Sequence, residues 1–248
     1  MENLLTIKEA ALFLNVSEMS LRRWTNTGKL KCYRVGGKNE RRFTRQDLEG
    51  FLQLSEGRVP LGIGDASVED FSHIAHFYKD ADESVAAGIN YLECGLSRGE
   101  SILLISTDDR LARISAGLTG LGFPVDKLKS DGLMVTDNGR CDVNEQSQFL
   151  ASAMAGFPID KGFRLLGDMT WAVEKGWSLE GISRLEGLTN QLLVGRNRLL
   201  LCQYDLTFFG ADGAMMAFDA HSLTIYRGEV KQSPYFMGST VYKPDNPE

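Results

Sequence analysis

Two of the three histidines, His73 and His76, lie in the stretch FSHIAHFYKD with the spacing His-x-x-His. On a helix this spacing places both imidazole rings on one face, which would suit a metal ion. On a strand the two side chains point to opposite faces. The stretch is rich in aromatic residues and ends at the break DADE, so we predict a strand. A metal site would then need His221 and Cys202 to approach through tertiary folding alone. We therefore expect neither a metal nor a cofactor, and we expect His76 to be exposed or at an edge.

Polar and aromatic side chains also end three apolar runs, LLISTDD, LLGDMTW and LLLCQYD. In an open α/β sheet, ligands bind beyond the carboxyl ends of the strands. The alternatives are that Asp168 caps the following turn, that Trp171 belongs to the core, and that Cys202 is a buried small apolar residue. The ligand interpretation predicts a pocket for a small polar or reactive molecule, lined by Thr107, Asp168, Trp171, Cys202, Tyr204 and Asp205.

The elements that would position these side chains alternate between strand and helix. HIAHFYK, ESILLIST, FRLLGDMTW and NRLLLCQYD have strand patterns, whereas DESVAAGINYLECGL, DDRLARISAGLTGLG and SLEGISRLEGLTNQLL have helical ones. Short apolar strands between helices are typical of a parallel sheet covered on both faces. The sequence thus predicts an α/β body over residues 69–248, preceded by a linker over residues 55–68 that contains three glycines and a proline.

The composition is that of a globular protein, because 43% of the 248 residues are hydrophobic and 24% are charged. No apolar run is long enough for a membrane span, and the N-terminus MENLLTIKEA lacks the pattern of a signal peptide. These features lead us to expect a cytoplasmic protein. The four cysteines stand far apart without a C-x-x-C pair, which predicts reduced thiols instead of a disulfide framework or a zinc ribbon.

Charge is divided unevenly along the chain. Residues 1–58 carry 11 Lys and Arg against 7 Asp and Glu, a net charge of +4. Residues 59–248 carry 16 against 26, a net charge of −10. This division predicts that only the N-terminal part approaches a polyanion.

That N-terminal part has the pattern of a helix-turn-helix. The apolar face of its first helix would consist of Ile7, Ala10, Ala11 and Leu14. A second helix would begin after Ser17 as N-cap, be anchored by Leu21 and Trp24, and turn arginine and asparagine side chains outward to read bases. A hairpin around GGKNE would then bring basic residues to the phosphates. The residues predicted to contact DNA are Ser17, Glu18, Ser20, Arg22, Arg23, Asn26, Arg34, Lys38, Arg41 and Arg42.

VSEMSLRRWTNTGKL resembles the small winged helix-turn-helix of the MerR and excisionase families, whose pattern is VS-x-x-T-[VI]-x-x-[LW]-x-x-x-G-x-[LI]. It departs from that pattern at Ser20, where threonine is commoner. The resemblance covers residues 1–54 and implies double-stranded DNA as the partner. A single module of this size contacts too few base pairs for genomic specificity, so we expect a homodimer or a tandem arrangement.

The body resembles RecA-like ATPases of the circadian clock type, through the stretch that begins GLSRGESILLIST and through RLLGDMTW. The phosphate-binding pattern G-x-x-x-x-G-K-[ST] does not occur in the chain. Without this backbone cradle and its lysine, the β and γ phosphates have no site. ATP hydrolysis is therefore not expected.

A closer resemblance is to the MEDS domain, the sensory domain of methylotroph regulators and methanogen signalling proteins. Its segments appear in order as HIAHFY, GLSRGESILLIST, RLLGDMTW, LCQYD and AHSLTIYRGEV. The family pattern GEM-x-W becomes GDMTW, with Asp168 in place of glutamate. The resemblance implies a degenerate RecA-type fold that senses one-carbon or simple hydrocarbon-derived metabolites, and it assigns His73 to the ligand site with Phe77 and Tyr78.

The hypothesis that joins these observations is a ligand-responsive transcription regulator and not an enzyme. H-E-x-x-H does not occur in the sequence, and the G-x-S-x-G match GLSRG follows a helical pattern and precedes a strand, whereas a nucleophile elbow lies between a strand and the helix after it. Two alternatives remain open at this point. One is an excisionase-like architectural DNA-binding protein whose body serves only assembly, and the other is a degenerate nucleotide-binding enzyme.

Overall fold

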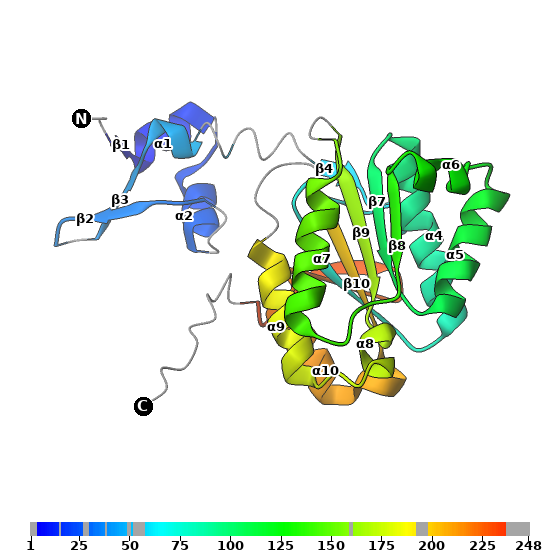
Figure 1. Cartoon of the computed structure of the whole chain (residues 1–248). Helices are drawn as coiled ribbons and strands as arrows, with labels where there is room; N and C mark the ends of the chain where they lie inside the picture. The colour runs from blue at the N-terminus through cyan, green and yellow to red at the C-terminus, as the bar shows by residue number, and fades with distance from the viewer. Residues whose placement is uncertain are drawn as a thin grey trace. The chain divides into compact units, whose positions relative to one another are not determined.

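The computed structural model describes residues 4–14, 16–26, 30–37, 39–48, 51, 58–158, 161–191 and 198–236 (Figure 1). The chain divides into two compact units, Met1–Arg58 and Val59–Glu248. Within the described residues, no helix is both long and apolar enough to cross a membrane. Each unit has a hydrophobic core of its own.

The N-terminal unit packs α1, α2 and a further helical segment that includes residues 45–48 against a three-stranded antiparallel sheet of order β1-β3-β2. Its elements are β1 (Leu5–Thr6), α1 (Ile7–Leu14), α2 (Glu18–Asn26), β2 (Tyr33–Val35) and β3 (Glu40–Phe43). α1 begins with a capping box, because the Thr6 amide donates to Glu9 Oε2 (2.7 Å) and the Glu9 amide donates to Thr6 Oγ1 (3.3 Å). The buried core is formed by Ala10, Ala11, Leu14, Leu21, Leu30, Phe43 and Leu48, so the predicted helix-turn-helix packing is confirmed.

The C-terminal unit is built around a seven-stranded sheet of order β12-β11-β6-β10-β9-β7-β8. All neighbouring strands in it are parallel except β11 and β12. The strands of this unit are β4 (Arg58–Pro60), β5 (Ser67–Glu69), β6 (His73–Tyr78), β7 (Ser101–Ile105), β8 (Met134–Asp137), β9 (Phe163–Asp168), β10 (Arg198–Asp205), β11 (Leu223–Tyr226) and β12 (Glu229–Gln232). The predicted α/β class and mostly parallel sheet are confirmed.

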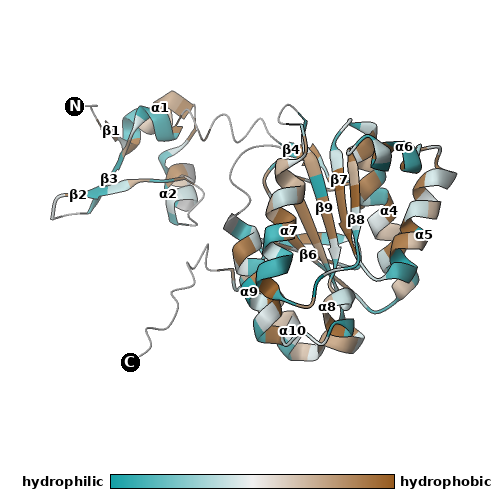
Figure 2. Ribbon diagram, in the orientation of Figure 1, coloured by the Kyte–Doolittle hydropathy of each residue, from teal (hydrophilic) through white to brown (hydrophobic). Residues whose placement is uncertain are grey.

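Helices cover both faces of this sheet. They are α4 (Ala81–Ser97), α5 (Asp108–Gly120), α6 (Val125–Ser130), α7 (Val143–Ala155), α8 (Thr170–Glu174), α9 (Leu179–Gln191) and α10 (Leu206–Ala220). α4, α5 and α6 pack on one face, which we call the α4 face, and contribute Tyr91 and Ile114 to its core. α7 to α10 pack on the other, which we call the α9 face, and contribute Trp171 and Leu185. Figure 2 shows the resulting pattern, with apolar residues along the strands and polar residues on the outer sides of the helices.

Residues 55–57 of the segment predicted as a linker (55–68) lie outside the described residues. The remainder, residues 58–68, is folded and not an extended connection. β4 and β5 pair as a two-stranded sheet, and Leu61, Ile63 and Val68 are buried in the core of the α4 face. Gly62 has φ +82° and packs so closely on α4 that an added Cβ would lie 2.4 Å from the Asn90 carbonyl oxygen. Gly62 therefore allows close packing, and the division between the units falls at Arg58.

Candidate functional site

The sheet separates the predicted ligand residues into two groups, because successive side chains of a strand point to opposite faces. The group on the α9 face comprises His73, Phe77, Trp171, Cys202 and Tyr204. The group on the α4 face comprises Tyr78, Asp168 and Asp205, which approach one another through Arg110 of α5. Thr107 lies at the carboxyl end of β7, as the N-cap residue of α5. The structure therefore does not bring the predicted set together in one pocket.

The two histidines of FSHIAHFYKD lie on one strand, as predicted, but both are buried. Their exposed fractions are 1% for His73 and 2% for His76. The expectation that His76 is exposed or at an edge is wrong, because β6 lies inside the sheet between β11 and β10 and is covered on both faces. The Nδ1 atom of His76 lies 3.0 Å from Nε2 of Gln203, on the neighbouring strand.

Four side chains that commonly bind metals or protons meet on the α9 face. They are His73 of β6, Cys202 of β10, Glu186 of α9 and His221, which directly follows α10. His73 Nε2 lies 3.3 Å from Cys202 Sγ and 3.2 Å from Glu186 Oε2. Glu186 Oε2 lies 3.6 Å from Cys202 Sγ and 3.6 Å from His221 Nε2. All four are buried, and we call them the His-Cys-Glu cluster.

The cluster perturbs the titration of its own members. Burial raises the pKa of the Glu186 carboxyl, whereas the hydrogen bond from the Tyr204 hydroxyl lowers it. Burial, with the neighbouring Glu186, raises the pKa of the Cys202 thiol well above its ordinary value. Burial, with the nearby His73, lowers the pKa of His221 to about 3. By itself the cluster therefore contains a protonated Cys202 and a neutral His221.

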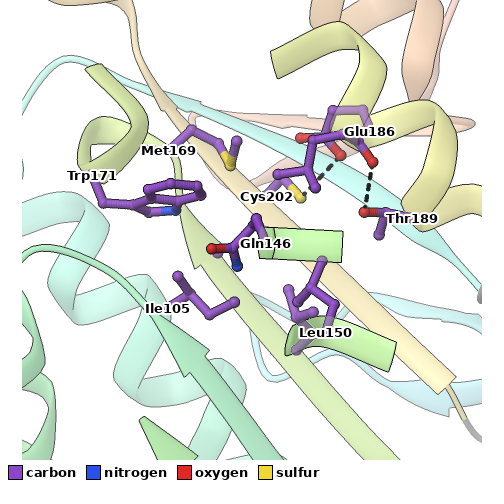
Figure 3. A pocket seen from close by; sticks show the side chains of 11 residues that line it. Ile105, Gln146, Leu150, Met169, Trp171, Glu186, Thr189 and Cys202 are labelled. Carbon is purple, nitrogen blue, oxygen red and sulfur yellow. Dashed lines mark hydrogen bonds between the residues drawn. The ribbon is translucent and has the colours of Figure 1, made fainter. Parts of the chain in front are cut away.

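A cavity lies beside this cluster, and Glu186 and Cys202 form part of its wall (Figure 3). The Gln146 side chain is fully buried, and its Oε1 accepts a hydrogen bond from the Arg140 amide (2.9 Å). Its Nε2 has no hydrogen-bond partner within the described part of the chain. The other lining residues are Ile105, Leu150, Leu165, Gly167, Met169, Trp171, Leu185 and Thr189. The cavity is thus mostly apolar, with one free donor, one carboxylate and one thiol.

The polar group on the α4 face has a different character, because its side chains pair with one another. Arg110 Nη1 donates to Asp168, to the Tyr78 hydroxyl and to Ser84 Oγ, the last at 2.9 Å. Asp168 also accepts from the backbone amide of Thr170 (3.0 Å). Burial raises the pKa of the Tyr78 hydroxyl above its ordinary value, and the charge of Asp168 adds to the effect. This network is a buried structural ion pair at the carboxyl edge of the sheet, and Asp168 caps the turn before α8.

Aspartates occupy the helix N-termini at this edge. Asp80, Asp142 and Asp205 are the N-caps of α4, α7 and α10, and each accepts a backbone hydrogen bond from its own helix. Two further carboxylates, Asp108 and Asp109, lie in the first turn of α5. A helix N-terminus binds phosphate through free amides and a positive dipole end. Carboxylates at these positions disfavour the nucleotide-binding alternative.

His76 should make the stability of the body depend on pH. Burial lowers the pKa of His76 from 6.5 to about 4. The unfolded chain therefore binds more protons than the folded chain between these two pH values, and stability falls as the pH is lowered through this window. The loss attributable to His76 is at most about 3 kcal/mol. We expect the urea midpoint of the wild type to fall between about pH 7 and about pH 5, and that of His76→Gln to fall less. An equal fall in both would refute the assignment.

In the N-terminal unit, α2 presents its predicted reading residues to solvent. Ser17, Arg22 and Asn26 are exposed and Glu18 is half-buried. Arg22 Nη2 lies 3.4 Å from Glu18 Oε2 one turn earlier. The side chains of Ser20 and Arg23 lie outside the described residues, although their backbone belongs to α2.

The hairpin of β2 and β3 carries the other predicted DNA contacts. Arg34 is exposed, Arg42 pairs with Glu40 (2.8 Å), and Lys38 lies outside the described residues. Arg41 donates from Nε to Thr25 Oγ1 (2.9 Å) and from Nη2 to Asn26 Oδ1 (2.6 Å). Arg41 therefore joins β3 to α2 and occupies the Oδ1 acceptor of Asn26.

Sequence reasoning missed Glu186, Arg110 and Gln146, and for two of them a signal existed. Glu186 stands four residues after Ile182 on the apolar stripe of α9, and Arg110 stands four residues before Ile114 on that of α5. A charged residue on the inward stripe of a helix must find a buried partner. Gln146 gives no such signal, because glutamine is common on the outer face of a helix.

Family comparisons match one domain in each unit. The family described as "MEthanogen/methylotroph, DcmR Sensory domain" matches residues 72–222, and a helix-turn-helix domain family matches residues 4–53. The chain is 32% identical over 245 residues to the transcriptional repressor DcmR of Methylorubrum extorquens (strain DSM 6343 / CIP 106787 / DM4). The match covers 90% of this chain and 91% of that protein. The chain therefore belongs to the family of transcriptional regulators that carry a helix-turn-helix domain followed by a MEDS sensory domain.

Proposed function

We propose that this regulator is a ligand-responsive repressor whose body senses a one-carbon or simple hydrocarbon-derived metabolite in the cavity of Figure 3. The observation that carries the proposal is the Gln146 amide, a buried donor without a partner in a mostly apolar cavity. A buried donor costs free energy unless an acceptor reaches it. A small molecule with an apolar part and one acceptor atom would satisfy both the donor and the walls. Repression is proposed from the name of the relative, DcmR.

Binding can control DNA occupancy only if the ligand prefers one of two conformations of the protein. The cavity is lined by residues of α7, α8 and α9 and of β7, β9 and β10, so a ligand there would contact both the sheet and the helices of the α9 face. We infer that the liganded body changes the geometry of a homodimer, and with it the spacing of the two helix-turn-helix domains on repeated half-sites. The same proposal has three further parts: the protein forms a homodimer or a higher homo-oligomer, it acts in the cytoplasm, and it catalyses no reaction.

The direct test is thermal unfolding of the intact chain with dichloromethane or methanol as probe. A ligand at 100 times its Kd stabilises the folded state by about 2.7 kcal/mol. For a body of this size that corresponds to an increase in Tm of about 5–10 °C. A probe that raises the Tm should also change the affinity for a DNA duplex selected from a random library by the same protein. A change in Tm without a change in DNA affinity would refute the regulatory part of the proposal.

Filling the cavity should abolish this response. An added Cβ at Gly167 would lie 3.5 Å from Leu165 Cδ2, 3.8 Å from Met169 Sδ and 4.0 Å from Cys202 Sγ, which are ordinary contacts. We therefore expect Gly167→Ala to fold and to lose most of the Tm increase given by the active probe. The matched control is Gly120→Ala, because an added Cβ there meets nothing within 4 Å. An unchanged Tm increase in Gly167→Ala would place the ligand elsewhere.

Arg22 is the exposed α2 side chain best placed to read a base. Arginine contacts guanine through two hydrogen bonds worth about 1–3 kcal/mol. We expect Arg22→Ala to weaken binding to the selected duplex by about 10-fold or more at fixed salt, with less discrimination at one base pair. Arg113→Ala on α5, whose partner is Asp82, serves as the matched control. Equal affinities of Arg22→Ala and wild type would remove Arg22 from the interface.

A further inference from the structure

Hydrogen bonds to groups outside the His-Cys-Glu cluster fix the tautomers of its two imidazole rings. His221 Nδ1 lies 2.7 Å from the Ala217 carbonyl oxygen. A carbonyl oxygen only accepts, so Nδ1 of His221 carries the proton. Its Nε2 then presents a lone pair toward Glu186 Oε2, 3.6 Å away, and has no hydrogen-bond partner among the described residues.

His73 is held in the same tautomer through Asn190 of α9. The Asn190 amide donates from Nδ2 to the Ala220 carbonyl oxygen (2.9 Å), which fixes which end of the amide is which. Its Oδ1 therefore faces His73 Nδ1 at 2.9 Å, and Nδ1 of His73 carries the proton. The Nε2 lone pair of His73 points at Glu186 Oε2, at 3.2 Å, and at Cys202 Sγ.

Two of the four converging atoms, the Nε2 atoms of the neutral imidazole rings, thus carry no proton of their own, and Nε2 of His221 has no hydrogen-bond partner among the described residues. The Cys202 thiol carries at most one proton, which can bridge to one of these atoms at a time. Unpaired acceptors in a buried site are unfavourable, and the exposed fractions of these side chains are 2% or less for His73, Glu186 and His221. A cation at the centre would satisfy all four atoms at once.

The separations fit a tetrahedral ion. With ordinary Zn²⁺ bond lengths, tetrahedral geometry puts nitrogen and oxygen ligands about 3.3–3.4 Å apart and a sulfur about 3.5 Å from either. Four of the six distances between the ligand atoms are 3.2, 3.3, 3.6 and 3.6 Å, and all six are at most 4.8 Å. Histidines that ligate metals commonly donate their other ring N–H to a carbonyl oxygen, as both rings do here.

We propose that His73, Glu186, Cys202 and His221 form a binding site for one Zn²⁺ ion per chain. Imidazole nitrogen, thiolate sulfur and carboxylate oxygen are all Zn²⁺ ligands, and four protein ligands complete the coordination shell. Cys202 binds as the thiolate, and its proton is released to solvent on metal binding. Tyr204 donates to Oε1 of Glu186 and leaves Oε2 for the metal. The site does not depend on the proposed effector, which would occupy the cavity lined by Glu186 and Cys202 but not by His73 or His221.

The test uses the full chain without an affinity tag, stripped of metal and titrated with Co²⁺. We expect saturation at one equivalent, intense visible d–d bands of tetrahedral Co²⁺, and a thiolate-to-Co²⁺ charge-transfer band. Zn²⁺ should displace Co²⁺ and remove both bands. Elemental analysis of the protein as purified should find one zinc per chain. Absence of the bands in wild type would overturn the proposal without affecting the effector experiment.

Variants assign the bands to these residues. Cys202→Ser should lose the charge-transfer band, whereas the control Cys141→Ser, which removes an exposed thiol, should keep it. Glu186→Gln should weaken Co²⁺ binding, although the amide oxygen of the glutamine can still accept the hydrogen bond from the Tyr204 hydroxyl. Asn190→Ala, which removes the group that positions His73, should weaken Co²⁺ binding by about 10–100-fold and keep the charge-transfer band. Bands that survive Cys202→Ser, or that disappear in Cys141→Ser, would place the metal elsewhere and overturn the assignment.

Discussion

Replacing Asp168 with alanine is expected to lower the free energy of unfolding of the α/β body by about 3–5 kcal/mol. Asp168 is 1% exposed and forms a buried ion pair with Arg110, whose side chain is 10% exposed. The substitution leaves the Arg110 guanidinium buried without the Asp168 carboxylate, and the Tyr78 hydroxyl loses its acceptor at 3.2 Å. Urea unfolding of the intact chain, followed by tryptophan fluorescence, measures the change, because Trp171 lies three residues along the chain from Asp168.

A double-mutant cycle separates the ion pair from a general loss of packing. Arg110→Met removes the charge and keeps most of the side-chain volume. We expect the double variant Arg110→Met with Asp168→Ala to be more stable than the sum of the two single changes, by about 1–3 kcal/mol. If Asp168→Ala unfolds within about 0.5 kcal/mol of the wild type, the pair is not structural, and Asp168 returns as a candidate ligand residue.

The division of the predicted ligand residues between two faces follows from strand alternation. His73 and Phe77 are four residues apart on β6 and share a face, whereas Tyr78 falls on the other. The same alternation places His73 and His76 on opposite faces, and it places Tyr204 and Asp205 on opposite faces of β10. The strand itself was predictable from its aromatic and apolar content. Its burial on both faces was not, because that depends on the position of β6 inside the sheet.

The members of the His-Cys-Glu cluster could not be assembled from the sequence, because they come from four separate elements. His73 and Cys202 become neighbours through the parallel pairing of β6 and β10, in which Cys202 is opposite Ala75. Glu186 and His221 reach the same point from α9 and from the end of α10. The inward stripe of α9 does identify Glu186 as a buried carboxylate, but nothing local indicates which partners it meets.

The predicted linker shows a third kind of limit. Glycine and proline between two patterned regions usually mark a flexible connection, and the linker is predicted from this composition alone. In the structure, the carbonyl oxygens of Pro60 and Leu61 accept hydrogen bonds from Arg164 of β9, at 2.7 and 2.8 Å. Arg164, 103 residues further along the chain than Leu61, thus holds this segment through hydrogen bonds. The sequence of the segment itself gives no sign of this contact.

Arg164→Met is therefore expected to be among the most destabilising single changes in the body, costing about 3–5 kcal/mol. The Arg164 side chain is fully buried, pairs with Glu100 at 2.6 Å and donates to the Tyr91 carbonyl oxygen at 3.0 Å as well as to the two carbonyls of the segment. Without it, these acceptors lose a donor inside the protein. Hydrogen exchange should rise most across residues 58–69, because β4 and β5 are held to the sheet through this side chain.

Arg98→Met provides a matched control for this prediction, because Arg98 pairs with the same carboxylate. Its Nε lies 2.7 Å from Glu100 Oε1, but its side chain is 42% exposed. An exposed ion pair of this kind contributes less than about 1 kcal/mol. The difference between the two variants measures what burial and the backbone carbonyls add to one shared salt bridge. Equal costs for Arg164→Met and Arg98→Met, or unchanged exchange across residues 58–69, would show that the segment is held by its apolar contacts alone.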